Sequence, residues 1–208
     1  GLVPSFATTL TWRKFISTAW SNYGVRVTEE EAKAFRETFF TQFSELRRWH
    51  SHQRSMAQKY KRVYSPLGRC RNLPDIDSKD EGVKAEAERQ AINAPVQGFA
   101  SDMALLSMVL LSKEFRRRGL KTHSVGAVHD AVNFEAPDEE LVTVLPIIKR
   151  TMENLPLEKL FGVYIDIPII ADLKCGDTWG GSEEIPAELL TRTGRGGLHA
   201  WLKERGRI

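Results

Sequence analysis

The sequence predicts an α+β fold in which helices pack on one face of a small antiparallel sheet. Two observations carry this prediction. Apolar side chains recur every three or four residues between Thr28 and Lys59, which is the spacing of an amphipathic helix. Two short apolar runs, from Thr122 to His129 and from Ala131 to Ala136, meet at a His-Asp pair and are typical of a β-hairpin.

The predicted elements of the first 80 residues begin with a short helix. Residues 12–20 favour this helix, and Gly24 closes it because glycine readily adopts the left-handed conformation of a helix end. Thr28 and Glu31 form a capping box, so the long amphipathic helix begins there. Residues 69–73 favour a short, basic extended segment.

Proline and glycine divide the middle of the chain in this prediction. The residues from Glu81 to Ala94 have a helical pattern, and Pro95 and Gly98 then break it. From about Gly98 to Arg118, the nearly all-apolar sequence predicts a second helix that is buried on most sides.

The C-terminal part is predicted to hold a helix, a strand and a tail. The helix begins at Pro137-Asp138 and presents four apolar side chains on one face, Leu141, Leu145, Ile148 and Met152. Residues 163–174 are rich in Val and Ile and favour a strand, with Pro168 indicating an edge or a bulge. Residues 180–208 mix glycine with arginine and indicate a loosely held extension around one short helix.

Composition and charge narrow the class of protein. With 208 residues and 41% apolar content, the chain is long enough for a core-bearing domain. It has no apolar run of 18 residues and no signal pattern, which favours an intracellular, cytoplasmic protein without membrane insertion. Cys70 and Cys175 lack the neighbouring ligands of a zinc site and do not form a disulfide framework. The net charge of +3 does not by itself indicate a polyanionic partner.

Two groups of polar residues indicate chemistry. Asp130 lies at a strand junction between apolar residues, where a carboxylate is costly unless a cation compensates it, so Asp130 is a candidate metal ligand. Arg89, Asn93 and Gln97 are spaced four residues apart, and the first two share a helix face. Such side chains can donate to the acceptors that every base pair presents in the minor groove. The alternative is a polar helix face with a capping Gln.

Five segments carry a resemblance to a known family. In chain order they are Tyr23-Gly24-Val25, Leu67-Gly68-Arg69-Cys70-Arg71-Asn72-Leu73-Pro74-Asp75, Ala87-Glu88-Arg89-Gln90-Ala91-Ile92-Asn93-Ala94-Pro95-Val96-Gln97-Gly98, Val128-His129-Asp130 and Gly176-Asp177-Thr178-Trp179. In content and order they resemble the C-terminal palm of family A DNA polymerases, the DNA polymerase I family. The fold would then be the C-terminal part of that palm with part of the fingers.

The resemblance implies template-directed DNA synthesis. In this reaction two Mg²⁺ ions bridge the primer 3′-hydroxyl and the phosphates of the incoming deoxynucleoside triphosphate. Asp130 would be one of the two palm carboxylates that bind the metal ions, and His129 would lie near the primer terminus.

The resemblance also implies where primer-template DNA binds. Arg89, Asn93 and Gln97 would contact the minor groove near the insertion site. Arg69 and Arg71 are candidates for contacts with backbone phosphates. The implied domains are a helical segment derived from the fingers at 1–80, the palm with its catalytic hairpin at 81–179, and a basic C-terminal extension at 180–208.

The chain departs from the family pattern at points that bear on activity. Ala131 follows Asp130 where the family usually has Glu, so this second carboxylate is absent. The sequence also lacks a D-x-S-x-[IV]-E-like strand and the finger helix whose Lys and Arg hold the triphosphate. Since hard cations take several oxygen ligands, we do not expect Asp130 alone to bind two ions or support polymerisation.

The leading expectation is one piece of a divided family A polymerase, inactive alone and completed by a second polypeptide that carries the missing carboxylate and finger helix. A primer-template-binding or scaffolding remnant without catalysis stays open, and Ala131 favours it. A metal phosphohydrolase of the HD type is disfavoured because His50, His52, His123 and His199 lack ligand spacing. A phage-encoded protein in a host cell is one option for the source.

Overall fold

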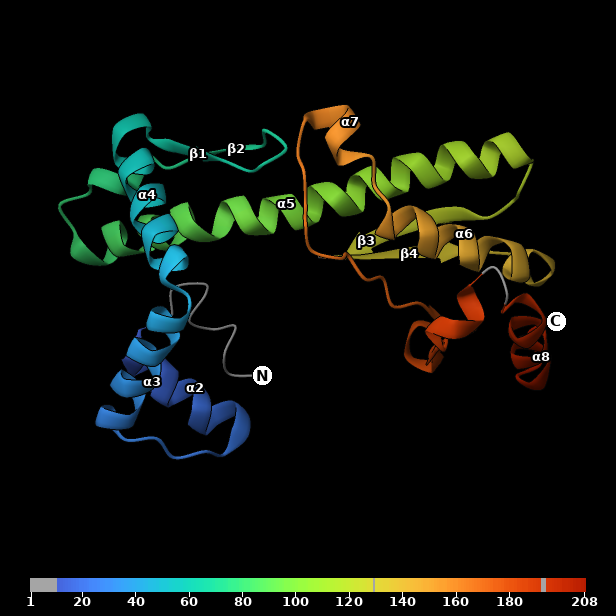
Figure 1. The fold of residues 1–208 in the computed structure, drawn as a ribbon, viewed down its shortest axis with the longest axis horizontal. Helices are drawn as coiled ribbons and strands as arrows, with labels where there is room; N and C mark the ends of the chain where they lie inside the picture. The colour runs from blue at the N-terminus through green and yellow to red at the C-terminus, as the bar shows by residue number, and fades with distance from the viewer. Residues whose placement is uncertain (1–10, 129, 192–193) are drawn as a thin grey trace. The chain divides into compact units, whose positions relative to one another are not determined.

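The computed structural model describes residues 11–128, 130–191 and 194–208. The chain divides into two compact units, an N-terminal unit that ends at Phe99 and a C-terminal unit that begins at Ala100. Helix α5 (Glu81–Arg118) runs through this boundary, so each unit contains part of it (Figure 1). Helices dominate, and the described residues form three two-stranded antiparallel sheets, which confirms the predicted α+β class.

From residue 11 onward, the N-terminal unit contains in turn the helices α2 (Trp12–Tyr23), α3 (Glu29–Gln42) and α4 (Ser44–Tyr60) (Figure 1). Gly24 ends α2 with a φ of 65°, in the predicted left-handed conformation. The predicted capping box is also present, because the Thr28 hydroxyl accepts from the Glu31 N–H at 3.2 Å and the Glu31 carboxylate accepts from the Thr28 N–H at 2.8 Å. The single helix predicted up to Lys59 is wrong, since Phe43 separates α3 from α4.

The interruption at Phe43 has a packing cause. The ring of Phe40, buried near the end of α3, lies 5.7 Å from the ring of His50 in α4, centroid to centroid. Phe39 lies against Phe43 at 5.0 Å. A straight helix would separate residues ten positions apart by about 15 Å along its axis. The bend therefore brings Phe40 and His50 into contact.

A small sheet completes the N-terminal unit. Strand β1 (Arg62–Tyr64) pairs antiparallel with β2 (Cys70–Asn72), and Val63 lies opposite Arg71. The core beneath it consists of buried side chains from α4, β1, the chain after β2, and α5, namely Ala57, Val63, Leu73, Ile76, Ala87 and Ala91. Strand β2 coincides with the extended segment that the sequence predicts.

Helix α5 is continuous over 38 residues, so the break predicted at Pro95 and Gly98 is wrong. A proline inside a helix costs about 3 kcal/mol, but Pro95 is buried and Ala91, one turn earlier, is fully buried. A Cβ at Gly98 would lie 3.5 Å from the side chain of Arg69, so the turn between β1 and β2 approaches the helix closely there. Tertiary packing outweighs the local preference of both residues.

The second part of α5 is less buried than predicted. Leu105 and Val109 are 47% and 50% exposed, although Leu111 and Phe115 are buried in the core. By length and composition alone α5 could cross a membrane, and the core helix of a soluble protein meets the same criterion.

The C-terminal unit is built around a β-hairpin. The remaining strands and α-helices, in chain order, are β3 (His123–Val128), β4 (Ala131–Glu135), α6 (Leu141–Glu153), α7 (Leu157–Phe161), β5 (Lys174–Cys175), β6 (Glu183–Glu184) and α8 (Arg195–Glu204) (Figure 1). The 3-10 helices among the described residues are η1 (Pro74–Asp77) in the N-terminal unit and η2 (Asp138–Glu140), η3 (Trp179–Gly181) and η4 (Ala187–Leu190) in the C-terminal unit. The hairpin and the helix after Pro137 agree with the prediction.

Two predictions for the C-terminal unit are wrong. Residues 163–173 have no regular secondary structure, and within the described chain only Lys174 of the predicted strand pairs with another strand, as the first residue of β5. The tail is not loosely held, because Leu198 and Leu202 of α8 are fully buried. They join the core cluster that includes Val144 of α6. The sequence signal for this packing is the apolar pair four residues apart, which lies on one helix face.

Two polar contacts fix the elements that flank the hairpin. The Glu140 carboxylate accepts from the Lys121 N–H at 2.8 Å and from the Thr122 N–H at 2.9 Å, directly before β3. Lys149 of α6 donates to the Ala171 carbonyl at 2.8 Å and to Glu153 at 2.6 Å. The first contact ties the start of the hairpin to α6, and the second ties the irregular segment 163–173 to the same helix.

The Glu140 contact predicts a pH dependence of stability. Hydrogen bonds from Lys121 and then Thr122 lower the pKa of Glu140 below its ordinary value of 4.5. A carboxylate whose folded pKa is lowered stabilises the fold above the unfolded pKa and loses this effect as the pH falls through the folded pKa. We expect Glu140→Gln to lower the Tm near neutral pH, with the gap to the parent closing at acidic pH.

Thermal unfolding followed by circular dichroism over a pH series measures this gap. Glu139→Gln, which changes an exposed neighbour, is the matched control and should leave the Tm unchanged. A gap for Glu140→Gln that stays constant at acidic pH would contradict the assignment.

The Lys149 contact predicts a loss of stability on truncation. Lys149→Met keeps the length of the side chain but leaves the half-buried Glu153 carboxylate and the Ala171 carbonyl without this donor. We expect a loss of about 2 kcal/mol in the free energy of unfolding, measured by urea titration. Lys159→Met, at an exposed position in α7, is the control, and an equal loss in both variants would refute the role of Lys149.

Candidate nucleic-acid and metal-binding site

The tip of the hairpin carries Asp130. Val128 at the end of β3 pairs with Ala131 at the start of β4, so Asp130 lies in the connection between the two strands. Asp130 is exposed, and within the described residues it forms no ion pair and no hydrogen bond. The desolvation cost expected from the sequence is therefore absent. His129, predicted to lie near the primer terminus, falls outside the described residues.

The donor set near Asp130 limits what this chain can bind. Its free, exposed carboxylate fits the role of one oxygen ligand for a hard cation such as Mg²⁺. Across the described ranges, no group of three or more His, Cys, Asp or Glu side chains could hold a metal ion. Ala131, beside Asp130, offers no side-chain oxygen. A complete two-metal site therefore requires ligands beyond those that the described residues bring together.

The base of the hairpin is anchored. The Phe134 ring of β4 meets the Phe115 ring of α5 edge to face, with centroids 6.0 Å apart and planes at 81°. Together with the Glu140 contacts before β3, this packing leaves the tip projecting from a fixed base. Glu140 was not identified from the sequence, because its hydrogen-bond partners lie 18 and 19 residues away along the chain.

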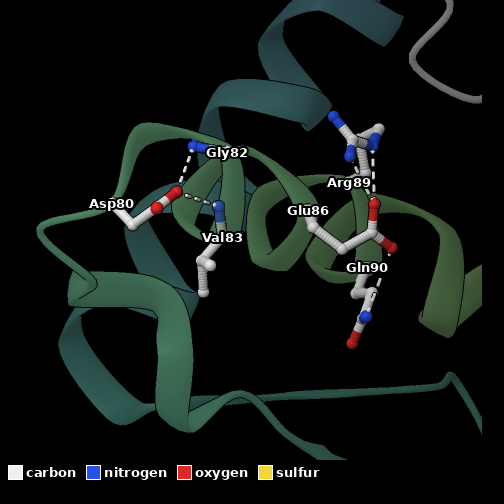
Figure 2. A network of polar contacts seen from close by, with 6 residues as sticks. All are labelled: Asp80, Gly82, Val83, Glu86, Arg89 and Gln90. Atoms are coloured by element: carbon white, nitrogen blue, oxygen red, sulfur yellow. Dashed lines mark hydrogen bonds and ion pairs between the residues drawn. The ribbon is translucent and has the colours of Figure 1, made fainter.

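The start of α5 is held by a polar network in the N-terminal unit. Figure 2 shows Asp80 accepting from the N–H groups of Gly82 and Val83, at 2.8 and 3.0 Å, which satisfies free donors of the first turn. One turn later, the Glu86 carboxylate accepts from Arg89 Nε at 2.9 Å and from Gln90 Nε2 at 3.3 Å. The hydrogen bond from Arg89, and then that from Gln90, lowers the pKa of Glu86.

Arg89, Asn93 and Gln97 share one face, because α5 continues through Pro95. Over eight residues their positions rotate by about 80° around the helix axis. Arg89 and Gln97 are exposed, whereas Oδ1 of the half-buried Asn93 is shielded and has no hydrogen-bond partner within the described residues. A shielded polar atom without a partner is uncommon in folded proteins and lowers stability.

The small sheet places the two predicted arginines beside this helix. Arg71 donates from Nη2 to Oε1 of Gln90 at 3.1 Å. Arg69 lies beside Gly98, the neighbour of Gln97. The structure thus brings the five predicted DNA-binding residues together in the N-terminal unit, whereas Asp130 belongs to the C-terminal unit.

Sequence reasoning missed Glu86 and Gln90, which hold the side chains of Arg89 and Arg71. Glu86 precedes Arg89 by three residues, a spacing that favours an ion pair on a helix and could have identified it. The bond between Gln90 and Arg71 spans 19 residues and leaves no local signal.

Known proteins match most of the chain. The sequence profile of DNA polymerase family A matches residues 20–181. The DNA polymerase of Bacillus phage SP01 is 33% identical over 176 residues, which are 84% of this chain and 19% of that protein. The thermostable DNA polymerase I of Thermus aquaticus is 33% identical over 156 residues, 74% of this chain and 18% of that protein. The chain thus spans about a fifth of the length of these relatives.

A solved structure shows the same fold. It is the POL domain of Pol1 from M. smegmatis in complex with DNA primer-template and dNTP, with a TM-score of 0.67 and 27% sequence identity. The match covers 79% of this chain and 27% of that chain. The profile match includes both the polar face of α5 and the hairpin tip at Asp130. On this similarity in sequence and fold, the chain belongs to DNA polymerase family A.

Proposed function

We propose that this chain is the C-terminal piece of a family A DNA polymerase site, which a second polypeptide completes, and that it is inactive alone. The observation that carries the proposal is the exposed carboxylate of Asp130 at the tip of a hairpin with an anchored base, in a chain that also exposes Arg89 and Gln97 of α5. The reaction is template-directed transfer of a deoxynucleotide to a primer, inside the cell. Residues 1–80 would derive from the fingers, 81–179 from the palm, and 180–208 form the C-terminal extension.

Asp130 has the role of a metal ligand in this proposal. When bound, Mg²⁺ would supply the positive charge that activates the primer 3′-hydroxyl and neutralises the triphosphate. The anchored base of the hairpin fixes the position of the carboxylate, so little ordering is needed on binding. The second polypeptide carries the other palm carboxylate and the finger helix, because one carboxylate cannot satisfy two hard cations. We assign His129 to the primer terminus.

The N-terminal unit contacts the primer-template in this proposal. Arg89, Asn93 and Gln97 donate to minor-groove acceptors common to all base pairs, which tests pairing geometry without reading the sequence. In this role Asn93 would donate through Nδ2, the donor of its side-chain amide. Arg69 and Arg71 contact backbone phosphates. The M. smegmatis relative was solved with primer-template DNA and dNTP, the ligands that we propose here.

A non-catalytic remnant that binds or scaffolds primer-template DNA is the second candidate. Ala131 favours it, because this residue removes a carboxylate beside Asp130. The two candidates differ in whether Asp130 matters once the chain is assembled with its partner.

The first test is primer extension with Mg²⁺ and all four deoxynucleotides. We expect no extension by the chain alone and extension after addition of a polypeptide with the first part of a family A polymerase domain. Asp130→Asn should abolish the restored activity because it removes a metal ligand, and chelation of Mg²⁺ should have the same effect. Asp166→Asn, at another exposed aspartate, should retain it.

Complex formation without extension would favour the remnant. Absence of both a complex and extension would refute the divided polymerase.

The second test concerns the polar face of α5. The double substitution Asn93→Ala and Gln97→Ala removes two proposed minor-groove donors and leaves the net charge of the chain unchanged. We expect affinity for primer-template DNA to fall by about tenfold, or about 1.4 kcal/mol, and by the same factor for duplexes of different sequence. Fluorescence anisotropy measures the affinity, with the exposed Gln42→Ala as control. A loss confined to one DNA sequence would contradict minor-groove contacts of this kind.

A further inference from the structure

Positive charge is concentrated in one segment of the chain. Between Ser44 and Asn72, which includes α4 and the small sheet, eight residues are Lys or Arg and one is acidic, a net charge of +7. The whole chain has a net charge of only +3, so the rest of it is acidic on balance. Arg69 and Arg71 supply only two of the eight positive charges in this segment.

Cations on one side of α4 form ion pairs with other elements of the N-terminal unit. Arg47 pairs with Glu37 of α3 at 2.9 Å, and Arg54 pairs with Glu88 of α5 at 3.6 Å. Lys61, just after the helix, pairs with Asp77. These cations lie on the same side of the helix as the buried His50 and Ala57 and connect α4 to the rest of the N-terminal unit.

The opposite face of α4 points its cations to solvent. We define this outer face by three exposed residues of α4, Arg48, His52 and Lys59, together with the exposed Arg62, which begins β1 two residues after the helix ends. Arg48 forms only a local pair with Glu45, at 3.1 Å, in which both side chains are more than 75% exposed. Lys59 lies over the ring of the exposed Tyr60 at 4.9 Å. Arg62 forms no ion pair within the part of the chain that the structure describes.

The spacing of these residues fits a nucleic-acid backbone. Arg48 and Lys59 are eleven residues apart, or about 16 Å along the helix axis. This length corresponds to about five phosphates of one strand at about 3.4 Å of duplex axis each.

We propose that the outer face of α4 binds the phosphodiester backbone of DNA, in addition to the contacts made by Arg69 and Arg71. This inference rests on the proposed function, which supplies DNA as the ligand. The exposed Arg48 pair is worth little in water, so a phosphate can displace Glu45 at small cost. The exposed cations of the outer face complement the negative charge of a phosphate backbone, so we assign the surface to DNA.

The test compares two double variants with the same change in charge. Lys59→Glu with Arg62→Glu alters the outer face, whereas Lys113→Glu with Lys203→Glu alters two exposed lysines of the C-terminal unit. Binding of the full chain to primer-template DNA is measured by fluorescence anisotropy over a salt series, without Mg²⁺ or deoxynucleotides. Because each lost phosphate contact lowers the slope of log affinity against log salt by about 0.9, we expect the slope to fall by about 1.8 for the outer-face variant alone.

The Lys59→Gln and Arg62→Gln variant removes the contacts without adding negative charge and should lower the slope equally. Circular dichroism verifies that each variant is folded. Equal slopes for the outer-face and control variants would overturn the inference and leave the proposed function standing. Failure of the unaltered chain to bind DNA would overturn both.

A poly-glutamate peptide serves as the probe for an acidic protein partner. The inference would be overturned if the unaltered chain binds this peptide, the outer-face variant does not, and the salt slope for DNA is the same for both. The surface would then be assigned to an acidic protein partner.

Discussion

The position of Asp130 depends on the contacts at the base of the β3–β4 hairpin. An isolated two-stranded hairpin is marginally stable in water, so its tip can be placed only if neighbouring elements hold its ends. Two contacts do so, the Glu140 carboxylate before β3 and the edge-to-face contact between Phe134 and Phe115. Neither contact reaches the tip. The contacts therefore hold the base of the hairpin and leave the carboxylate exposed at its tip.

Local signals were sufficient for the helix ends and the hairpin. Gly24 and the capping box at Thr28 depend on a few neighbouring residues, and the structure contains both as predicted. The errors arose where distant contacts decide the conformation. The bend at Phe43 follows from the contact between two helices, and α5 continues through Pro95 because the surrounding residues are packed. A strand over residues 163–173 would need a neighbour with which to pair, and the sequence pattern does not report one.

For the candidate site too, the sequence indicated the residue types but not the contacts that depend on distant parts of the chain. Residue pattern and resemblance identified Asp130 and the polar residues of α5, and the continuous helix places the latter on one face. The sequence did not reveal that Asp130 is exposed or that Oδ1 of Asn93 lacks a partner. Nδ2 of Asn133, on β4, is likewise shielded and unpartnered among the described residues. Each such group costs about 1–3 kcal/mol, which is a cost to stability that functional surfaces often carry.

Acetylation of a lysine near the end of α4 would have different effects at different positions, because the two sides of the helix have different surroundings. Lys59 and Lys61 are two residues apart, but Lys61 pairs with Asp77 whereas Lys59 extends into solvent over Tyr60. Acetylation removes one positive charge at either site. At Lys61 it would leave Asp77 without its cation and loosen the connection between α4 and η1. At Lys59 it would leave the fold intact and change only the attraction of ligands to the surface. Two lysines at the end of α4, two residues apart, would therefore affect different properties of the protein.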